Sequence, residues 1–215
     1  MTRIEVGLKN GISSEDAKKI ATPGVKPLPE QILQDTPLPA EQHTTFRALG
    51  ARCNYLAADR PDIQYSAKEI CRWMANPTEL SMAALRKLGR FLTGRRRLVF
   101  RFPYQRADRV ECYSDTDWAG CVRTRKSTSG GVIMIGTHVL KTWSSTQPSV
   151  SLSSEEAEYY GVVKATGATM GQQALMGDLG TPLRPRFWTD SSAAIGVATR
   201  SGLGKIRHLE THTLW

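Results

Sequence analysis

The spacing of apolar residues changes near residue 106, and this change constrains the fold more than any other feature of the sequence. Before it, apolar residues recur every three or four positions, as on one face of an α-helix. After it, short apolar segments separated by turn residues are typical of β-strands. We therefore expect an extended linker over residues 1–40, a helical segment over 41–105 and an α/β domain over 106–215.

Three amphipathic helices are predicted in the helical segment. Their apolar stripes are Phe46, Leu49, Cys53 and Leu56; Ile63, Ala67, Ile70 and Met74; and Met82, Leu85, Leu88 and Leu92. Asp59 and Thr78 are the expected N-caps of the second and third helices, because their side-chain oxygens can accept a free helix amide. Helices of this kind bury their stripes only against one another, which predicts a small bundle.

Three consecutive strands are predicted next, followed by a helix, a strand and a second helix. The strands cover 110–114, 130–136 and 138–145, the long helix 153–179, the fourth strand 185–189 and the last helix 191–199. Short turns join the first three strands into an antiparallel meander. The expected fold class is α/β, with a mixed sheet and helices packed on it.

Three acidic residues are predicted to meet at one edge of this sheet. Asp115 follows the first strand, Glu158 lies near the start of the long helix, and Asp190 follows the fourth strand. Three carboxylates can bind hard divalent cations and leave coordination positions for water and phosphate. The pattern therefore indicates a magnesium-dependent nuclease.

Glu158 differs from the other glutamates at the start of the long helix. Ser153 and Glu156 have the spacing of a capping box, in which the glutamate reaches back to the cap amide. Glu158 instead shares a stripe with Val162, Ala165 and Thr169, so it projects toward the sheet. A carboxylate on a packing face is costly unless a cation or a proton neutralises it, so we expect such a partner for Glu158.

The two aspartate positions each have an alternative. Asp117 would share a strand face with Asp115, so either side chain could be the ligand, or both could serve a turn. Asp190 could act only as a cap before Ser191.

The net charge of +9 and the sequence pI of about 9.6 favour a polyanionic partner. The run Arg95 to Arg97 is either a solvated turn or a contact to a nucleic-acid backbone. The four cysteines lack metal-ligand spacing and are expected to be reduced thiols. A signal peptide and an apolar run of membrane-spanning length are both absent, so we expect a soluble intracellular protein that contacts no membrane.

Several motifs together carry a family resemblance. They are Tyr113-Ser114-Asp115-Thr116-Asp117-Trp118-Ala119-Gly120-Cys121, Arg125-Lys126-Ser127-Thr128-Ser129-Gly130-Gly131, Trp143-Ser144-Ser145, Gln147-Pro148, Ser153-Ser154-Glu155-Glu156-Ala157-Glu158-Tyr159 and Thr189-Asp190-Ser191-Ser192-Ala193-Ala194-Ile195. In this order they resemble the ribonuclease H domain of copia-type retrotransposon polyproteins. Upstream, Asn54-Tyr55-Leu56, Arg60-Pro61-Asp62-Ile63 and Ala75-Asn76-Pro77-Thr78 resemble the thumb and connection that follow the polymerase palm.

The resemblance implies a ribonuclease H-like fold and hydrolysis of the RNA strand in an RNA/DNA hybrid by two Mg²⁺ ions, with Mn²⁺ as an alternative. Asp115, Glu158 and Asp190 match the catalytic and metal-binding acids. The residues assigned to substrate contacts are Arg125, Lys126, Ser129, Gln147, Ser191 and His208. The implied partners are the hybrid and the rest of the polyprotein, including its polymerase domain, in a cytoplasmic particle or the nucleus.

The chain also departs from this family pattern. The Y-x-D-D motif of the polymerase is absent, and a C-terminal strand and a helix with a fourth acid are expected to be missing after Trp215. Glu210, within His208-Leu209-Glu210, could approach the metal ions or support the substrate or the fold. A nucleic-acid-binding remnant without catalysis is therefore a second hypothesis. An integrase-type enzyme is disfavoured, because the glutamate lies between the two aspartates.

Overall fold

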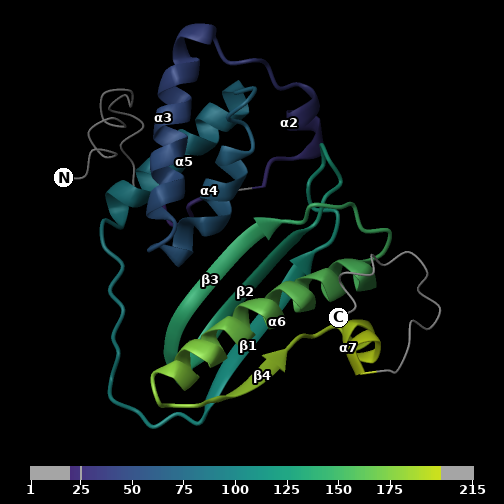
Figure 1. Cartoon of the computed structure of the whole chain (residues 1–215). Helices are drawn as coiled ribbons and strands as arrows, with labels where there is room; N and C mark the ends of the chain where they lie inside the picture. The colour runs from purple at the N-terminus through teal and green to yellow at the C-terminus, as the bar shows by residue number, and fades with distance from the viewer. Residues whose placement is uncertain (1–19, 25, 200–215) are drawn as a thin grey trace. The chain divides into compact units, whose positions relative to one another are not determined.

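The computed structural model describes residues 20–24 and 26–199, and the chain divides into two compact units at Phe100 and Arg101 (Figure 1). We call the part before this boundary the helical unit and the part after it the sheet unit. The predicted α/β class with a mixed sheet is confirmed within the sheet unit.

The helical unit is built from α2 (Pro29–Leu33), α3 (Ala40–Leu56), a 3₁₀ helix η2 (Pro61–Ile63), α4 (Gln64–Cys71) and α5 (Glu79–Gly94). Its core contains the three predicted stripes, with Leu56 and Met74 only partly buried at their ends. Phe91 joins this core from α5 and is almost fully buried. Thr78 caps α5 as predicted, since its Oγ1 accepts the Ser81 amide at 3.3 Å.

The sequence-based prediction of where the second helix begins is wrong. Asp59 does not cap it, because the chain first forms the 3₁₀ turn at Pro61 and becomes α-helical only at Gln64. The buried guanidinium of Arg60 donates to both carboxylate oxygens of Asp62, at 2.9 and 2.7 Å. This two-point ion pair holds the entry of the helix in place of a cap.

The described residues before α3 differ from an extended linker. They include the short helix α2, which starts at Pro29, where a missing amide is tolerated. Pro37 forms an isolated antiparallel bridge with Thr78, and Leu38 is buried in the helical core. Pro37 and Leu38 therefore attach this part of the chain to the helical core.

The sheet unit contains β1 (Arg109–Asp117), β2 (Thr128–Ile135), β3 (His138–Thr146), α6 (Ser154–Asp178), β4 (Arg184–Trp188) and α7 (Ser192–Thr199). The strand order is β3-β2-β1-β4. β1 and β2, and β2 and β3, pair antiparallel as predicted for the meander, whereas β4 pairs parallel to β1.

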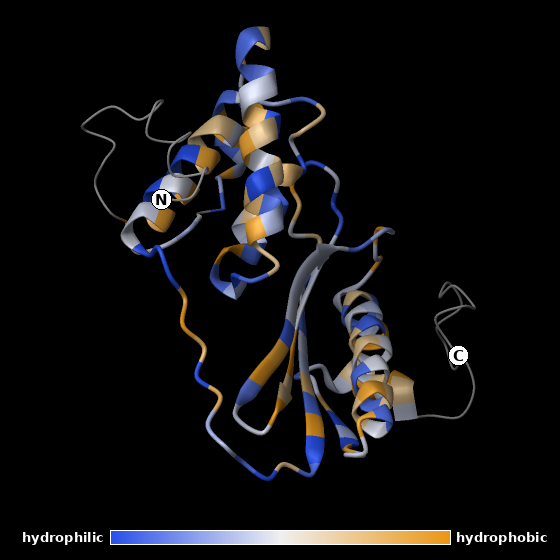
Figure 2. Cartoon of the chain, turned by 60° about the vertical axis from the view of Figure 1, so that its left-hand side comes forward, coloured by the Kyte–Doolittle hydropathy of each residue, from blue (hydrophilic) through white to orange (hydrophobic). Residues whose placement is uncertain are grey.

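The core of the sheet unit lies between the sheet and α6. Val110, Cys112 and Ile133 meet Ala165 of α6, and Leu183 closes the cluster before β4. Figure 2 shows α6 and α7 on the same side of this sheet, with hydrophobic and hydrophilic positions alternating along the strands. In β1 the alternation follows from the two-residue period of a strand, whereas all five residues of β4 are exposed.

Candidate metal centre

The carboxylates of Asp115, Glu158 and Asp190 come together in the sheet unit. One oxygen of each lies within 4.8 Å of the others, and no other group of three potential metal ligands is found in residues 20–24 and 26–199. Asp115 and Asp190 are exposed, whereas Glu158 is buried. One of the three carboxylates is therefore buried, and solvent can reach the other two.

The topology of the sheet explains why the two aspartates meet. β1 and β4 are parallel neighbours, and Tyr113 pairs with Trp188 in the last register position of this ladder. Asp115, still within β1, and Asp190, just past the end of β4, each follow two residues later, so both lie at the same edge of the sheet. In open α/β sheets this edge, outside the carboxyl ends of the strands, is the usual position of a site.

Glu158 reaches the same point from α6. Ser153 sets the start of this helix, because its Oγ accepts the Glu156 amide at 3.2 Å. One helical turn after Glu158, a Cβ atom at Gly161 would lie only 2.5 Å from Thr116 Oγ1. Glycine therefore allows α6 to approach β1 closely enough for the Glu158 side chain to reach the strand.

A main-chain amide links two of the acids. The N–H of Thr116 donates to Asp115 Oδ1 at 2.9 Å and to Glu158 Oε1 at 3.2 Å. The amide is available because β1 continues here beyond the end of β4. Sequence reasoning missed this contact, and no side-chain pattern could have shown it.

The electrostatics of Glu158 fit a cation ligand. Burial raises the pKa of Glu158 to about 7, and the charges of Asp115 and Asp190 add to the effect against the lowering by the Thr116 amide. Its Oε2 is buried and accepts no hydrogen bond within the described part of the chain. A buried carboxylate beside two others is neutralised either by a proton or by a hard cation such as Mg²⁺.

Gln147 and Ser129, which the resemblance assigns to substrate, lie in the interior. The Gln147 amide donates to Ser129 Oγ at 2.9 Å and to the Ala157 carbonyl at 2.8 Å, and its Oε1 accepts from Ser151. These bonds join β2, the start of α6 and the loop between β3 and α6. Through Ala157, the residue before Glu158, they position the helix that carries the buried acid.

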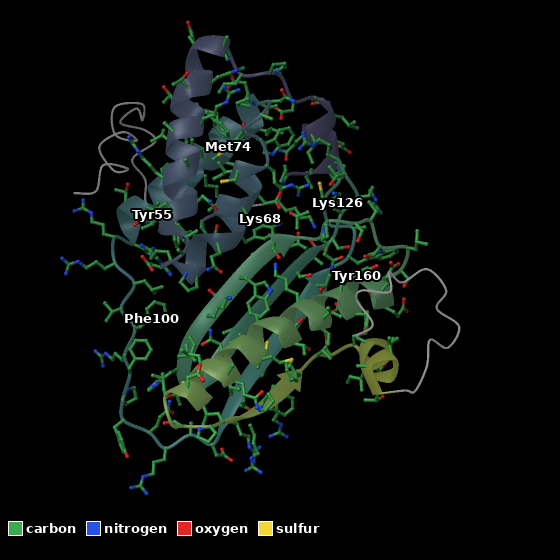
Figure 3. The ribbon with its side chains drawn as sticks, viewed as in Figure 1. Tyr55, Lys68, Met74, Phe100, Lys126 and Tyr160 are labelled. Atoms are coloured by element: carbon green, nitrogen blue, oxygen red, sulfur yellow. The ribbon has the colours of Figure 1, made fainter. Side chains whose placement is uncertain are left out.

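Arg125 and Lys126 belong to the loop between β1 and β2, where Figure 3 labels Lys126. Arg125 has a positive φ of 55°, and its amide donates to the Cys121 carbonyl at 2.7 Å. The Lys126 carbonyl accepts the Cys121 amide in return. These bonds give the basic loop a defined shape, with the Arg125 side chain exposed.

The remaining candidates have other positions. Ser191 caps α7, since its Oγ accepts the Ala194 amide at 3.1 Å. Asp117 is not a member of the acidic group, by which we mean Asp115, Glu158 and Asp190. Its carboxylate instead lies against Gly120 and occupies the space that a Cβ atom would need there. His208 and Glu210 lie outside the described residues.

The predicted capping box at α6 is only half formed. Ser153 caps the helix, but the carboxylate of Glu156 accepts the amide of Leu152 at 2.7 Å instead of the Ser153 amide.

Two further properties concern the chain as a whole. All four cysteines are free, as their spacing predicts. In residues 20–24 and 26–199, no helix combines the length and the apolar character that a membrane span requires.

Comparison with known proteins finds several relatives. The chain is 34% identical over 117 residues to the uncharacterized mitochondrial protein AtMg00810 of Arabidopsis thaliana, which covers 53% of this chain and 48% of that protein. It is 31% identical over 153 residues to the retrovirus-related Pol polyprotein from transposon RE1 of the same plant, covering 70% of this chain and 10% of the polyprotein. It is 30% identical over 180 residues to the retrovirus-related Pol polyprotein from transposon RE2 of Arabidopsis thaliana, covering 83% of this chain and 12% of the polyprotein.

The chain therefore spans about half the length of the mitochondrial relative and about a tenth of each polyprotein. No protein-family profile matches the chain. No solved structure matches it either.

Proposed function

The chain belongs to the copia-type retrotransposon polyproteins, and on this premise we propose that its sheet unit is a ribonuclease H-like nuclease. The proposed reaction is hydrolysis of the RNA strand of an RNA/DNA hybrid, with two Mg²⁺ ions as cofactors and Mn²⁺ as an alternative. The rest of such a polyprotein, including its polymerase domain, is the proposed partner of this unit.

The observation that carries the proposal is the meeting of three carboxylates, one of them buried. Their oxygens lie within 4.8 Å of one another, which suits oxygen-ligated divalent cations. The buried Oε2 of Glu158 has no hydrogen-bond donor in the described residues, as expected for an atom that coordinates a cation. An ordinary surface cluster of acids would not include a side chain that is only 7% exposed.

The residues of the chain divide the proposed task between them. Asp115 and Asp190, which are exposed, can hold ions while leaving coordination positions open to water and to a phosphate. Glu158 approaches from the interior, and the Thr116 amide orients it together with Asp115. When bound, a pair of Mg²⁺ ions lowers the pKa of the attacking water and stabilises the leaving 3′ oxygen.

The basic loop between β1 and β2 is the proposed contact to the substrate backbone. The exposed Arg125 side chain, together with Lys126, can pair with phosphates, which position a nucleic acid without reading its sequence. The 2′-hydroxyl of the RNA strand is the group by which such a site distinguishes RNA from DNA. Gln147 and Ser129 contribute indirectly, by holding β2 against α6.

Cleavage of a labelled RNA/DNA hybrid by the full chain in Mg²⁺ tests the proposal. Asp115→Asn, Glu158→Gln and Asp190→Asn should each reduce cleavage by about 100-fold or more, because each removes a charge that holds the ions. Asp117→Asn is the matched control, since it removes an exposed carboxylate from the same strand outside the acidic group. It should leave the rate nearly unchanged.

Two results would contradict this function. In the first, the wild-type chain binds the hybrid but does not cut it in Mg²⁺ or Mn²⁺, which would identify a nucleic-acid-binding remnant. In the second, Asp117→Asn is as inactive as Asp115→Asn, which would show that the reaction does not depend on Asp115, Glu158 and Asp190 in particular.

A further inference from the structure

The segment Arg95 to Arg106, which we call the connector, follows α5 and precedes β1 without forming a helix or a strand (Figure 1). Its sequence, RRRLVFRFPYQR, contains five arginines and three aromatic residues and no acidic residue. Residues 94 to 104 are all exposed. The connector is therefore a basic and aromatic surface outside both hydrophobic cores, with Arg95 lying over the ring of Phe91 at its start.

The apolar residues of the connector are unusual for a solvated linker. Flexible linkers are rich in Gly and Ser, and stiff ones in Pro or charged residues. Here Val99, Phe102 and Tyr104 are 74%, 59% and 88% exposed. Apolar side chains that are exposed next to one another mark a surface that binds something.

Part of the connector is fixed to the sheet unit. Gln105 donates to the Ile135 carbonyl at 2.7 Å and accepts the Thr137 amide at 3.0 Å, at the turn between β2 and β3. His138 bonds to the Pro103 carbonyl at 2.9 Å, and its ring packs edge-to-face on Phe102 at 5.1 Å between centroids. These contacts hold the backbone on both sides of Tyr104, which reduces the entropy lost when its ring binds a partner.

We propose that the connector binds a single-stranded nucleic acid, RNA or DNA. Its arginines pair with phosphates, and its exposed rings, above all Tyr104, stack on bases. This combination of a basic track and aromatic rings is how proteins bind single strands without reading their sequence. The excess of positive charge selects a polyanion, and the rings select one with flat bases over an acidic polypeptide. The inference goes beyond the proposed cleavage and does not depend on it.

Salt-dependent binding of a labelled single strand to the full chain tests the arginines. The probes are labelled 20-nucleotide oligo(dT) and oligo(U). Their binding is measured by fluorescence anisotropy in EDTA, where metal-dependent cleavage plays no part. For the triple variant Arg95→Gln, Arg96→Gln, Arg97→Gln, the slope of log K against log salt should become shallower by about 2, or about 0.7 for each lost phosphate contact.

The matched control removes three positive charges from the helical unit, with Arg52→Gln, Arg86→Gln and Lys87→Gln on α3 and α5. It should change the slope much less. Equal slopes for the two triple variants would overturn the proposal, because the binding would then depend on net charge alone.

Two tyrosines of nearly equal exposure test the stacking. Tyr104→Ala should weaken binding about fivefold or more, in line with the loss of one stacked base, whereas Tyr104→Phe keeps the ring and should bind nearly as the wild type does. Tyr55→Ala, at a position 85% exposed on α3, is the control and should have no effect (Figure 3).

Equal binding by the two alanine variants, or equally tight Arg-dependent binding to polyglutamate, would overturn the assignment of a nucleic-acid strand. All of these measurements are made in EDTA, so they report single-strand binding without metal-dependent cleavage. A failure of the proposed nuclease is thereby distinguished from a failure of the connector.

Discussion

The helical unit and the sheet unit fill their interiors differently. Among the described residues, thirteen buried hydrophobic residues belong to the helical unit and nine to the sheet unit, of which five form the core under α6. Buried polar and charged side chains show the opposite distribution, with three in the helical unit and nine in the sheet unit. The nine are Thr116, Ser127, Thr128, Ser129, Gln147, Ser151, Glu156, Glu158 and Thr169.

This difference indicates that the interior of the helical unit mainly provides stability, whereas the interior of the sheet unit also positions functional side chains. The helical interior is apolar, and its hydrophobic burial stabilises the fold directly. The interior of the sheet unit contains hydrogen-bonded polar groups that connect β2, α6 and the acidic group, so much of it positions side chains. Natural proteins commonly accept lower stability where function requires such groups.

The largest expected effect concerns the helical core. Phe91→Ala should lower the free energy of unfolding of the helical unit by about 3–5 kcal/mol, because it leaves a cavity in a fully packed interior. Hydrogen exchange followed by mass spectrometry should show faster exchange in α3, α4 and α5. Ile133→Ala is the counterpart in the sheet unit and should affect β1, β2 and α6 instead. Faster exchange throughout the chain in both variants would show that the two units unfold together.

In contrast to Phe91→Ala, a substitution of the buried Glu158 is expected to raise the free energy of unfolding. The pKa of Glu158 is raised to about 7 in the folded chain, so the stability associated with its neutral form is present below its ordinary pKa and is lost as the pH rises through 7. In EDTA at pH 8, Glu158→Gln should therefore raise the free energy of unfolding by about 1–3 kcal/mol, and this gain should disappear toward pH 4.5. Thermal unfolding at several pH values measures it.

Glu155→Gln is the control for this experiment. A hydrogen bond from its own backbone amide and another from Ser153 lower the pKa of Glu155, so losing this carboxylate should not stabilise the chain at pH 8. A wild-type chain whose stability relative to Glu158→Gln does not vary with pH would contradict the electrostatic picture of the site.

The smallest effects concern the two helix caps. Thr78→Ala and Ser153→Ala should each cost about 1 kcal/mol, since each leaves one helix amide without its acceptor. They differ in a second measurement. If Mg²⁺ binds as we propose, it should raise the melting temperature, and only Ser153→Ala should reduce this rise, because α6 carries Glu158. Equal responses to Mg²⁺ in the two variants would separate the start of α6 from the metal centre.

The local elements were largely predictable from the sequence. The stripes of α3, α4 and α5, the four strands and the cap of α5 follow from periodicity and from side-chain chemistry, and the structure confirms them. The end of β1 was not predictable from its own residues. It extends to Asp117 because Ser114 to Asp117 pair with β2, and such a ladder depends on the partner strand.

The candidate site was predictable only in part. The order and spacing of the acids lead to Asp115, Glu158 and Asp190, but the choice between Asp115 and Asp117 depends on where β4 ends beside β1. The Thr116 amide belongs to the main chain and has no sequence signal. The interior position of Gln147 likewise arises from the packing of β2 against α6.

Gly161 has a consequence for how this chain can change over evolutionary time. A methyl group at this position would collide with the Thr116 hydroxyl and push α6 outward, one turn from the glutamate it delivers. Such a displacement would move Glu158 away from Asp115 and Asp190. One carbon atom at position 161 would then be enough to weaken the metal binding that we propose for Asp115, Glu158 and Asp190.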